Sequence, residues 1–259
     1  MERRRLRGDL HVLVSEALEG VGVLAVFSER GGGVSEGPFA SLNVGFGVGD
    51  RTEAVRENRR RLAEALGVEA FAVGGLVHGS RVVRVGPRRA GAGFLGPDGR
   101  IRGADGLLTS SPALALAVTC ADCLPVALAA GDGRTVAVVH AGWRGLAAGI
   151  LQRAVAAFPD AGTVRAAIGP AVGPCHYEVG EDVALAVATG SEAGAVTRRR
   201  GGRIALDLAA TARAALRSLG VRRIDVADLC TACHPDRFFS HRRDGTTGRQ
   251  AAIAMRLPG

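Results

Sequence analysis

The chain has 259 residues, of which 47% are hydrophobic, and a formal net charge of +8 at pH 7. This length and apolar content allow a sizeable core and exclude a chain that is disordered throughout. All 33 basic residues are arginine, which excludes Schiff-base catalysis by lysine and the lysine of a phosphate-binding P-loop.

The first half of the chain predicts mostly strands, with one long helix. A strand at 22–29 leads into the glycine-rich loop 30–50. Helix 51–66 follows, capped by Asp50 with Glu53 and ended by Gly67. Further strands are predicted at 71–77, 82–86, 113–119, 124–129 and 134–139.

The second half alternates helices and strands. Helix 144–158 is stopped by Pro159. The remaining predicted elements are a strand at 163–168, helices at 180–189 and 207–219, and strands at 221–227 and 249–256. The stretches 86–99 and 189–202 are short enough to be loops. We therefore expect a single mixed α/β domain over 1–259, with helices covering sheet faces.

The N-terminus and the cysteines bear on the cellular setting. Charged residues interrupt any signal-peptide core in the first 20 residues, and no apolar run reaches the length of a membrane span. Five cysteines, an odd number, favour thiols that are buried, catalytic or metal-bound over a disulfide framework. These features predict a cytoplasmic protein with no membrane partner.

A β-hairpin is predicted within residues 118–145, VTCADCLPVALAAGDGRTVAVVHAGWRG, with Cys123 and His140 near its two ends. A turn at 131–132 would place these residues directly opposite each other, with Cβ atoms about 4.5–5.5 Å apart. A turn at 132–133 would place them diagonally on the same face, about 7–8 Å apart. A three-residue loop would put them on opposite faces.

Three interpretations of Cys123 and His140 remain open. They are a buried thiol and a satisfied imidazole, or a nucleophilic dyad whose ring is oriented by Asp122 or another carboxylate, or two ligands of one metal. His78, in GGLVHGS, also ends a strand-like run and would be a third ligand. Two imidazoles and one thiolate suit zinc and leave a fourth position for water.

Other metal sites and partners fit less well. Six histidines are too few for several coppers, and a blue-copper centre usually takes an axial ligand such as methionine, which is not obviously available here. A structural zinc site would pair Cys120 and Cys123 with Cys230 and Cys233, but these pairs are about 107 residues apart. An aromatic content of 4% and the lack of a recognition motif argue against nucleic acid.

Seven blocks, in order from about residue 22 to residue 253, resemble one family. They are FSERGGGVSEGPFASLN, VHG, ADGLLT, TCADCLPV, HAGWRG, IGPAVGPCHYEV and FFSHRRDGTTGRQ. They are similar to the motifs of the laccase-domain family of the YfiH and YlmD type. That family was once called multicopper polyphenol oxidases and is now regarded as purine nucleoside phosphorylases.

The resemblance implies a layered α/β/β/α sandwich with mixed sheets, like that of toxin cysteine hydrolases. It implies a metal, normally zinc, on His78, Cys123 and His140. The implied activity is phosphorolysis of adenosine, inosine and methylthioadenosine, with adenosine deamination in addition. Some bacterial members are described as peptidoglycan-editing factors, so an amidase using Cys123 is the alternative. Small-molecule nucleosides and phosphate are the expected partners of a monomer.

Phosphorolysis needs cations near the ribose, and the motif blocks supply arginines. Arg144, Arg242 and Arg243 are the candidate phosphate clamp, and His241 is a candidate proton donor. The loop Gly31–Gly33 is an alternative anion site. Ser41, Asn43 and Arg59 lie in blocks that resemble the family's pocket, and we expect them to bind substrate.

Two positions depart from the family pattern. Leu76 stands where Gln is common, and His176 stands where Cys is common. Neither is one of the three expected ligands, but both are expected to alter the surroundings of the pocket.

Overall fold

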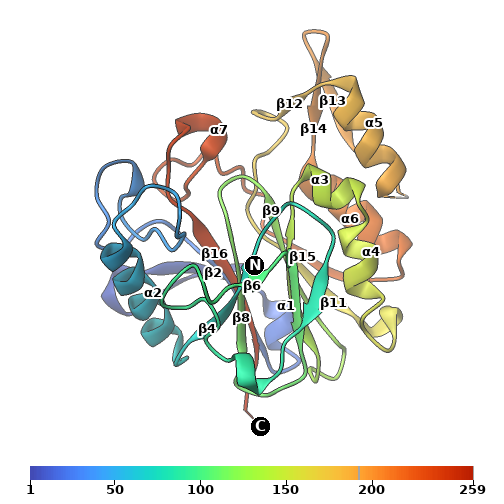
Figure 1. Cartoon of the computed structure of the whole chain (residues 1–259). Coiled ribbons are helices and arrows are strands. Elements are labelled where there is room, and N and C mark those ends of the chain that lie inside the picture. The colour runs from blue at the N-terminus through green and yellow to red at the C-terminus, as the bar shows by residue number, and fades with distance from the viewer. Residues whose placement is uncertain (192, 259) are drawn as a thin grey trace.

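The structure is a computed structural model that describes residues 1–191 and 193–258. Within these ranges the strands form three sheets (Figure 1). The seven-stranded sheet has the order β1 (Glu2–Arg5), β2 (His11–Val14), β3 (Val23–Ser28), β16 (Gln250–Arg256), β8 (Ala115–Cys120), β4 (Phe71–Gly75) and β6 (Ile101–Arg102). The six-stranded sheet has the order β15 (Arg223–Val226), β11 (Arg165–Ile168), β9 (Leu124–Ala129), β10 (Val136–Ala141), β7 (Gly106–Thr109) and β5 (Val82–Arg84). The small sheet has the order β12 (Glu178–Val179), β14 (Arg203–Leu206) and β13 (Thr197–Arg200).

The helices lie outside the two large sheets, except the first, which contacts β3 of one large sheet and β11 and β15 of the other. They are α1 (Glu16–Glu19), α2 (Thr52–Leu66), α3 (Trp143–Ala147), α4 (Ile150–Val155), α5 (Glu181–Gly190), α6 (Leu208–Ser218) and α7 (His241–Asp244). Short 3₁₀ turns occupy Arg7–Asp9, Gly37–Phe39, Pro87–Arg89 and Ala161–Thr163. No helix within the described ranges is both long and apolar enough to span a bilayer.

Three apolar clusters show why the sheets and helices form layers. One packs α2 against the seven-stranded sheet, and its members include Leu62, Phe71 and Ile253. The second fills the space between the two large sheets. The third packs α4 and α6 against the six-stranded sheet. Figure 1 accordingly shows α2 on one outer face and α4 and α6 on the other. The predicted α/β/β/α sandwich with mixed sheets is confirmed; the single domain over 1–259 stays a prediction.

The predicted elements are present, with shifts at their ends, except for one long helix. The segment 144–158 is divided into α3 and α4 because Gly149 adopts a left-handed conformation, with φ of 74°. Helix α2 ends at Gly67 as predicted, but its N-cap residue is Arg51 and no side chain caps it. The Asp50 carboxylate instead accepts hydrogen bonds from Ser35 and Asn43. Strands β1, β2, β6 and β7 and the small sheet were not among the predicted elements. The expectation of a loop at 189–202 is wrong in part, because β13 lies inside it and pairs with β14.

The β9–β10 hairpin has the register that places Cys123 and His140 on one face. Pro125 pairs with His140, and Ala130 pairs with Thr135 across the loop. The amide of Gly133 donates to the carbonyl of Ala130, so the turn is centred on 131–132 within a four-residue loop. The strands pair in the register expected for a two-residue turn at 132–133, because the four-residue loop 131–134 has the same midpoint.

Candidate metal centre

Three predicted ligands converge although they come from different elements. His78 follows β4, Cys123 immediately precedes β9, and His140 lies within β10. One ligand atom from each lies within 4.8 Å of the others, and the two imidazole rings meet edge to face with centroids 5.0 Å apart. His140 is 3% exposed, whereas the other two side chains reach solvent. The centre is therefore anchored inside a sheet and open on one side.

The buried carboxylate of Asp105 orients the imidazole of His140 and holds the backbone at His78. It lies 3.0 Å from Nδ1 of His140, and it accepts hydrogen bonds from the amides of Val77, His78 and Gly79 at 2.9–3.1 Å. These amides fix the backbone at His78, whose φ is 60°. Because the carboxylate is an acceptor, Nδ1 of His140 carries the proton and Nε2 is directed to the centre. The sequence interpretation named Asp122 or another carboxylate for this position; Asp105 occupies it.

Electrostatics couple Cys123 to His140. Burial raises the pKa of the Cys123 thiol, but hydrogen bonds from His140 and His78 outweigh it and bring the pKa down to about 6. Burial lowers the pKa of His140, but Asp105 and Cys123 raise it to about 9. The pKa of Asp105 is lowered, because the hydrogen bonds it accepts exceed the effect of burial. Without a metal, the site therefore favours a thiolate beside an imidazolium.

These residues fit a metal ion in donor chemistry and in spacing. A thiolate and two imidazoles are ligands that zinc accepts, at about 2.0–2.3 Å from the ion. A carboxylate that accepts the second ring N–H of a ligating histidine, as Asp105 does for His140, is a common outer partner at such sites. Gly142 leaves room beside the sulfur, since a Cβ there would lie 2.9 Å from Sγ of Cys123. The cluster can therefore hold a metal through three protein ligands, leaving a position open.

The three side chains line a pocket of about 740 Å³. Its other lining residues include Phe46, Tyr177, His241 and three arginines, Arg100, Arg242 and Arg249. The volume lies within the range of about 300–1,000 Å³ common for small-molecule sites. A cationic, partly aromatic wall therefore faces the candidate metal centre.

Asp122 holds one wall of this pocket. Its carboxylate accepts hydrogen bonds from the hydroxyl of Thr231 and from the backbone amide of Arg242. The guanidinium of Arg242 lies 5.1 Å from the ring centre of Tyr177, over its face. His241 has its Nδ1 within 2.6 Å of the carbonyl of Gly245, which leaves its Nε2 available. Predicted residues His241 and Arg242 thus lie at the pocket.

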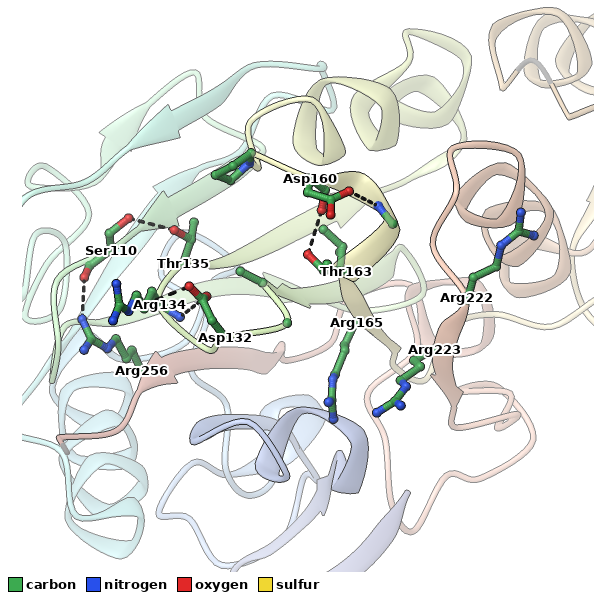
Figure 2. Close-up of a pocket in the computed structure, with 15 residues that line it drawn as sticks. Ser110, Asp132, Arg134, Thr135, Asp160, Thr163, Arg165, Arg222, Arg223 and Arg256 are labelled. Atoms are coloured by element: carbon green, nitrogen blue, oxygen red, sulfur yellow. Dashed lines mark hydrogen bonds and ion pairs between the residues drawn. The ribbon is translucent and has the colours of Figure 1, made fainter.

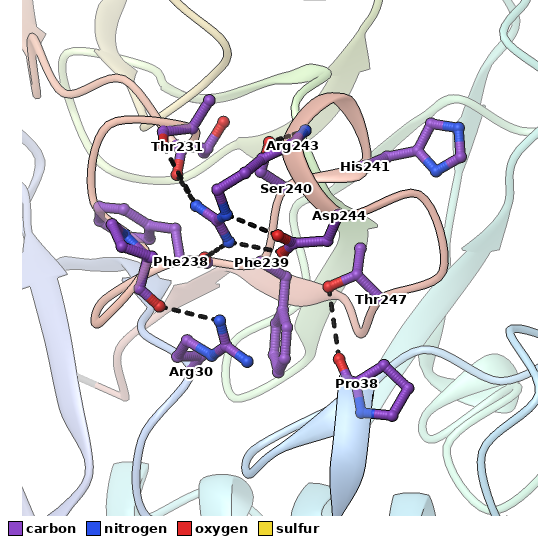
Figure 3. A network of polar contacts seen from close by, with 12 residues as sticks. Arg30, Pro38, Thr231, Phe238, Phe239, Ser240, His241, Arg243, Asp244 and Thr247 are labelled. Carbon is purple, nitrogen blue, oxygen red and sulfur yellow. Dashed lines mark hydrogen bonds and ion pairs between the residues drawn. The ribbon is translucent and has the colours of Figure 1, made fainter.

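Other predicted residues do not line the pocket. The guanidinium of Arg243 bonds the carbonyls of Thr231 and Phe238 and the carboxylate of Asp244 (Figure 3). Exposed Arg144 stacks on Trp143, with 4.4 Å from its guanidinium carbon to the ring centre. These contacts hold the local fold at Arg243 and leave Arg144 outside the cavity.

Ser41, Asn43 and Arg59 also form hydrogen bonds within the fold and do not line the pocket. Arg59 is 1% exposed, and its guanidinium bonds the carbonyls of Val44 and Gly93. Fully buried Asn43 accepts from the amide of Arg249, and the Ser41 hydroxyl accepts from the amide of Gly33. Because Arg249 itself lines the pocket, these blocks support the wall from behind. Their substrate-binding role stays a prediction.

Sequence reasoning did not single out four polar or aromatic residues that shape the pocket. They are Arg100, Asp105, Tyr177 and Arg249. Three of them lie inside the quoted motif blocks, in ADGLLT, PCHYEV and TTGRQ. The motif blocks therefore indicated the segments that form the pocket. Spacing along the chain did not show which residue of each block faces the metal centre.

A larger cavity, of about 880 Å³, lies beside the turn of the β9–β10 hairpin (Figure 2). Five arginines line it, Arg134, Arg165, Arg222, Arg223 and Arg256. None of its described lining residues is a cysteine or a histidine. Because the clustered metal-ligating side chains lie at the other end of the hairpin, we place the functional site there.

Cys120 and Cys123 do not meet Cys230 and Cys233, in agreement with the weak support from the sequence for a zinc site on these four cysteines. Cys120 is 2% exposed in the core, while Cys123 joins the two histidines. Cys230 and Cys233 instead meet Cys175 and His176. The cluster of Cys175, His176, Cys230 and Cys233 was not predicted, because its members come from two loops far apart in the sequence.

The model of the family described as multi-copper polyphenol oxidoreductase laccase matches residues 24–257. The chain belongs to this family. Purine nucleoside phosphorylase YfiH of Escherichia coli (strain K12) is 39% identical over 243 residues, covering 90% of this chain and 93% of that protein. Purine nucleoside phosphorylase of Xylella fastidiosa (strain 9a5c) is 42% identical over 254 residues, covering 94% and 96%.

Solved structures of this laccase-domain family share the fold. The crystal structure of YlmD from Geobacillus stearothermophilus superposes with a TM-score of 0.91 at 36% identity, covering 98% of each chain. That of the Bacillus licheniformis hypothetical protein YfiH gives a TM-score of 0.88 at 32% identity, covering 99% of each. The similarity extends over almost the full length of the chain, including every element that supplies the metal centre.

Proposed function

We propose that this laccase-domain protein is a zinc-dependent purine nucleoside phosphorylase acting on adenosine, inosine and methylthioadenosine, with adenosine deamination as a second activity. The observation that carries the proposal is the cluster of His78, Cys123 and His140 opening into a pocket lined by arginines. Relatives at about 40% identity that bear the name purine nucleoside phosphorylase support the reaction class.

In phosphorolysis, a phosphate oxygen bonds to C1′ of the ribose while the bond from C1′ to the purine nitrogen breaks. The electron pair moves to the purine, which takes up a proton. Arg242 and Arg249 supply positive charge for the phosphate, since guanidinium groups bind phosphate oxygens in pairs. His241 donates from Nδ1 to the carbonyl of Gly245, so its imidazolium form, with a proton on each ring nitrogen, would deliver the proton from Nε2.

His78, Cys123 and His140 would hold the zinc ion through two nitrogens and one sulfur. When bound, zinc supplies Lewis-acid charge and lowers the pKa of water, which is the chemistry that deamination at purine C6 needs. Asp105 keeps His140 in the tautomer that can bind metal. Tyr177 and Phe46 supply apolar and aromatic surface against which a purine can pack.

Copper oxidase chemistry has less support than zinc chemistry, despite the family's name. The sequence has six histidines, and two of them join the three-residue centre. Several coppers would need many more imidazole ligands. The donor set of one thiolate and two imidazoles instead suits zinc with an open position.

We further propose that the enzyme works as a monomer in the cytoplasm. All five cysteines are free, and free thiols persist in reducing compartments.

Product analysis tests the reaction directly. Purified protein is incubated with adenosine, with and without phosphate, and the products are separated by chromatography. Adenine and ribose 1-phosphate, formed only with phosphate, are expected, together with some inosine in both incubations. Absence of all three products at enzyme concentrations near that of the substrate would refute both activities.

A second candidate function uses Cys123 as a nucleophile in a hydrolase, such as a peptidoglycan-editing amidase. Cys123, His140 and Asp105 stand in the order of a nucleophile, its base and an orienting carboxylate. Metal analysis separates the two functions. A hydrolase of this type would work with metal-free protein, whereas the proposed zinc enzyme loses activity on chelation and regains it when zinc is returned.

A further inference from the structure

A second cluster of metal-ligating side chains lies outside the centre described above. Cys175 and His176 lie in the loop between β11 and β12, and Cys230 and Cys233 follow β15. One ligand atom from each lies within 4.8 Å of the others. Three thiols and an imidazole therefore converge from two loops far apart in sequence.

The distances within the cluster place three sulfurs around one nitrogen. Nδ1 of His176 lies 3.3 Å from Sγ of Cys175, 3.5 Å from Sγ of Cys233 and 3.8 Å from Sγ of Cys230. A neutral imidazole has at most one N–H to donate, so hydrogen bonding satisfies one of these approaches. Given zinc–sulfur and zinc–nitrogen bonds of about 2.3 and 2.0 Å, a nitrogen and a sulfur on one tetrahedral zinc ion lie about 3.5 Å apart, and two sulfurs lie about 3.8 Å apart.

We propose that Cys175, His176, Cys230 and Cys233 bind a second zinc ion, which is structural. Three cysteines and one histidine form one of the standard structural zinc sets. All four tetrahedral positions are taken by protein, so this ion has no open position for substrate. The spacing C-x-x-C of Cys230 and Cys233 is also that of a zinc-binding turn.

The backbone around the cluster is arranged to support metal-bound sulfur. The amide of Gly173 donates to Sγ of Cys230 at 3.2 Å, which is the kind of outer contact that orients metal ligands. A Cβ on Gly173 would lie 3.1 Å from Cβ of Cys230 and 3.4 Å from Sγ of Cys175, so glycine permits the close approach. Ala171 forms a parallel bridge with Cys230, which continues the parallel pairing of β11 and β15.

A disulfide between Cys175 and Cys233 would explain the positions of only two of the four side chains in the cluster. Sγ of Cys175 lies 3.4 Å from Sγ of Cys233, and oxidation would join that pair. It would leave the third thiol, of Cys230, and the imidazole of His176 converging on the same point without a function. A metal uses all four groups, so it is the proposal, and the disulfide is an outcome of the test.

The position of the cluster suggests what the ion does. The loop holding Cys175 also carries Val172 and Tyr177, which line the pocket of the first centre. The segment holding Cys230 and Cys233 leads into α7, which presents His241 and Arg242 to that pocket. A zinc ion joining the two loops would fix two walls of the pocket relative to each other.

Metal analysis of purified variants, by mass spectrometry of bound zinc, tests the proposal independently of catalysis. Wild-type protein is expected to hold about two zinc ions per chain, and Cys233→Ser and Cys123→Ala about one each. Cys120→Ala removes a thiol from neither cluster and is the matched control, with two ions expected. One ion in wild type that Cys233→Ser retains and Cys123→Ala loses would overturn the proposal.

A conservative variant and cobalt spectroscopy separate metal binding from a merely structural role. His176→Cys would retain the ion as a four-cysteine site, whereas His176→Ala would lose it. Cobalt bound to Cys123→Ala should show tetrahedral absorption with strong thiolate charge transfer. An octahedral spectrum without that charge transfer, or a freshly purified chain lighter by two hydrogens because Cys175 and Cys233 are joined, would overturn the proposal.

Discussion

Replacing Asp105 with Asn should weaken metal binding while preserving side-chain volume. One carboxylate oxygen accepts from the amide of His78 and faces Nδ1 of His140, and the other accepts from the amides of Val77 and Gly79. An Asn side chain has one oxygen and one NH2 group. In either orientation, the NH2 group therefore faces two N–H groups that in the wild type face a carboxylate oxygen.

The loss can be bounded from these contacts. If NH2 faces His140, the ring must accept at Nδ1, and its proton moves to the nitrogen that should bind metal. Changes to such outer partners typically cost about 10–100-fold in metal affinity, or about 1.4–2.8 kcal/mol. If NH2 faces the two amides, each loses a buried acceptor at about 1–3 kcal/mol, and the backbone at His78 is released. We therefore expect Asp105→Asn to bind zinc at least about tenfold more weakly.

Zinc affinity is measured by competition with a chromophoric chelator, and stability by urea unfolding of metal-free protein. Asp225→Asn is the control, because Asp225 accepts from Ser15 and Ala17 and contacts neither imidazole. The control should lose stability at unchanged zinc affinity. Zinc affinity of Asp105→Asn within about twofold of wild type would show that the carboxylate does not set the tautomer of His140.

Three further predictions follow from the site. At pH 7, zinc should displace about one proton from the Cys123–His140 pair, because the thiol has a pKa of about 6 and the imidazolium one of about 9. Affinity should therefore rise with pH between these values, which calorimetry in several buffers can measure. Gly142→Ala should weaken zinc retention about tenfold or more, since its Cβ would meet the sulfur at 2.9 Å. Arg242→Gln should raise the phosphate KM about tenfold at unchanged stability, whereas Arg243→Gln should lower the unfolding free energy by about 1–3 kcal/mol.

Several results would contradict these predictions. Zinc binding without proton release at pH 7 would mean that the pair is not a thiolate and an imidazolium before the metal binds. Gly96→Ala is the control for Gly142→Ala and should retain zinc, because a Cβ added at Gly96 would meet no heavy atom within 4 Å. Equal effects of the two arginine variants on stability would remove the distinction between a pocket residue and a structural one.

Local sequence rules predicted most of the fold because hydrophobic periodicity and turn residues are local properties. Residues 124–129 and 134–139 predicted the central hairpin, and its face alternation placed Cys123 and His140 together. The same rules failed for helix 144–158, where Gly149 has a left-handed conformation. They also failed for Asp50, whose carboxylate bonds side chains from outside the helix instead of capping it. In both cases tertiary contacts or backbone conformation overrode the local preference.

The site itself was only partly predictable. His78 was proposed from its position after a strand-like run, but Asp105 lies on a different loop and meets His140 through the pairing of β7 with β10. The arginines could not be ranked from the sequence, because the chain has many of them and their chemistry is the same. Only the three-dimensional contacts distinguish Arg59, which bonds buried carbonyls, from Arg249, which lines the pocket.

The pocket wall that carries Tyr177, His241 and Arg242 depends on few regular elements. The loop after β11 and the segment from Cys230 to α7 are tied through Asp122, whose backbone carbonyl accepts from the amide of Val172 and whose carboxylate accepts from Thr231 and Arg242. A structural zinc ion on Cys230 would add a second tie between the same two segments. Because Arg242 stacks on Tyr177 across this junction, loosening either tie should raise nucleoside and phosphate KM more than it lowers zinc affinity at the first centre. The site on His78, Cys123 and His140 would then serve the chemistry, and the site that includes Cys230 would hold the pocket walls in place relative to each other.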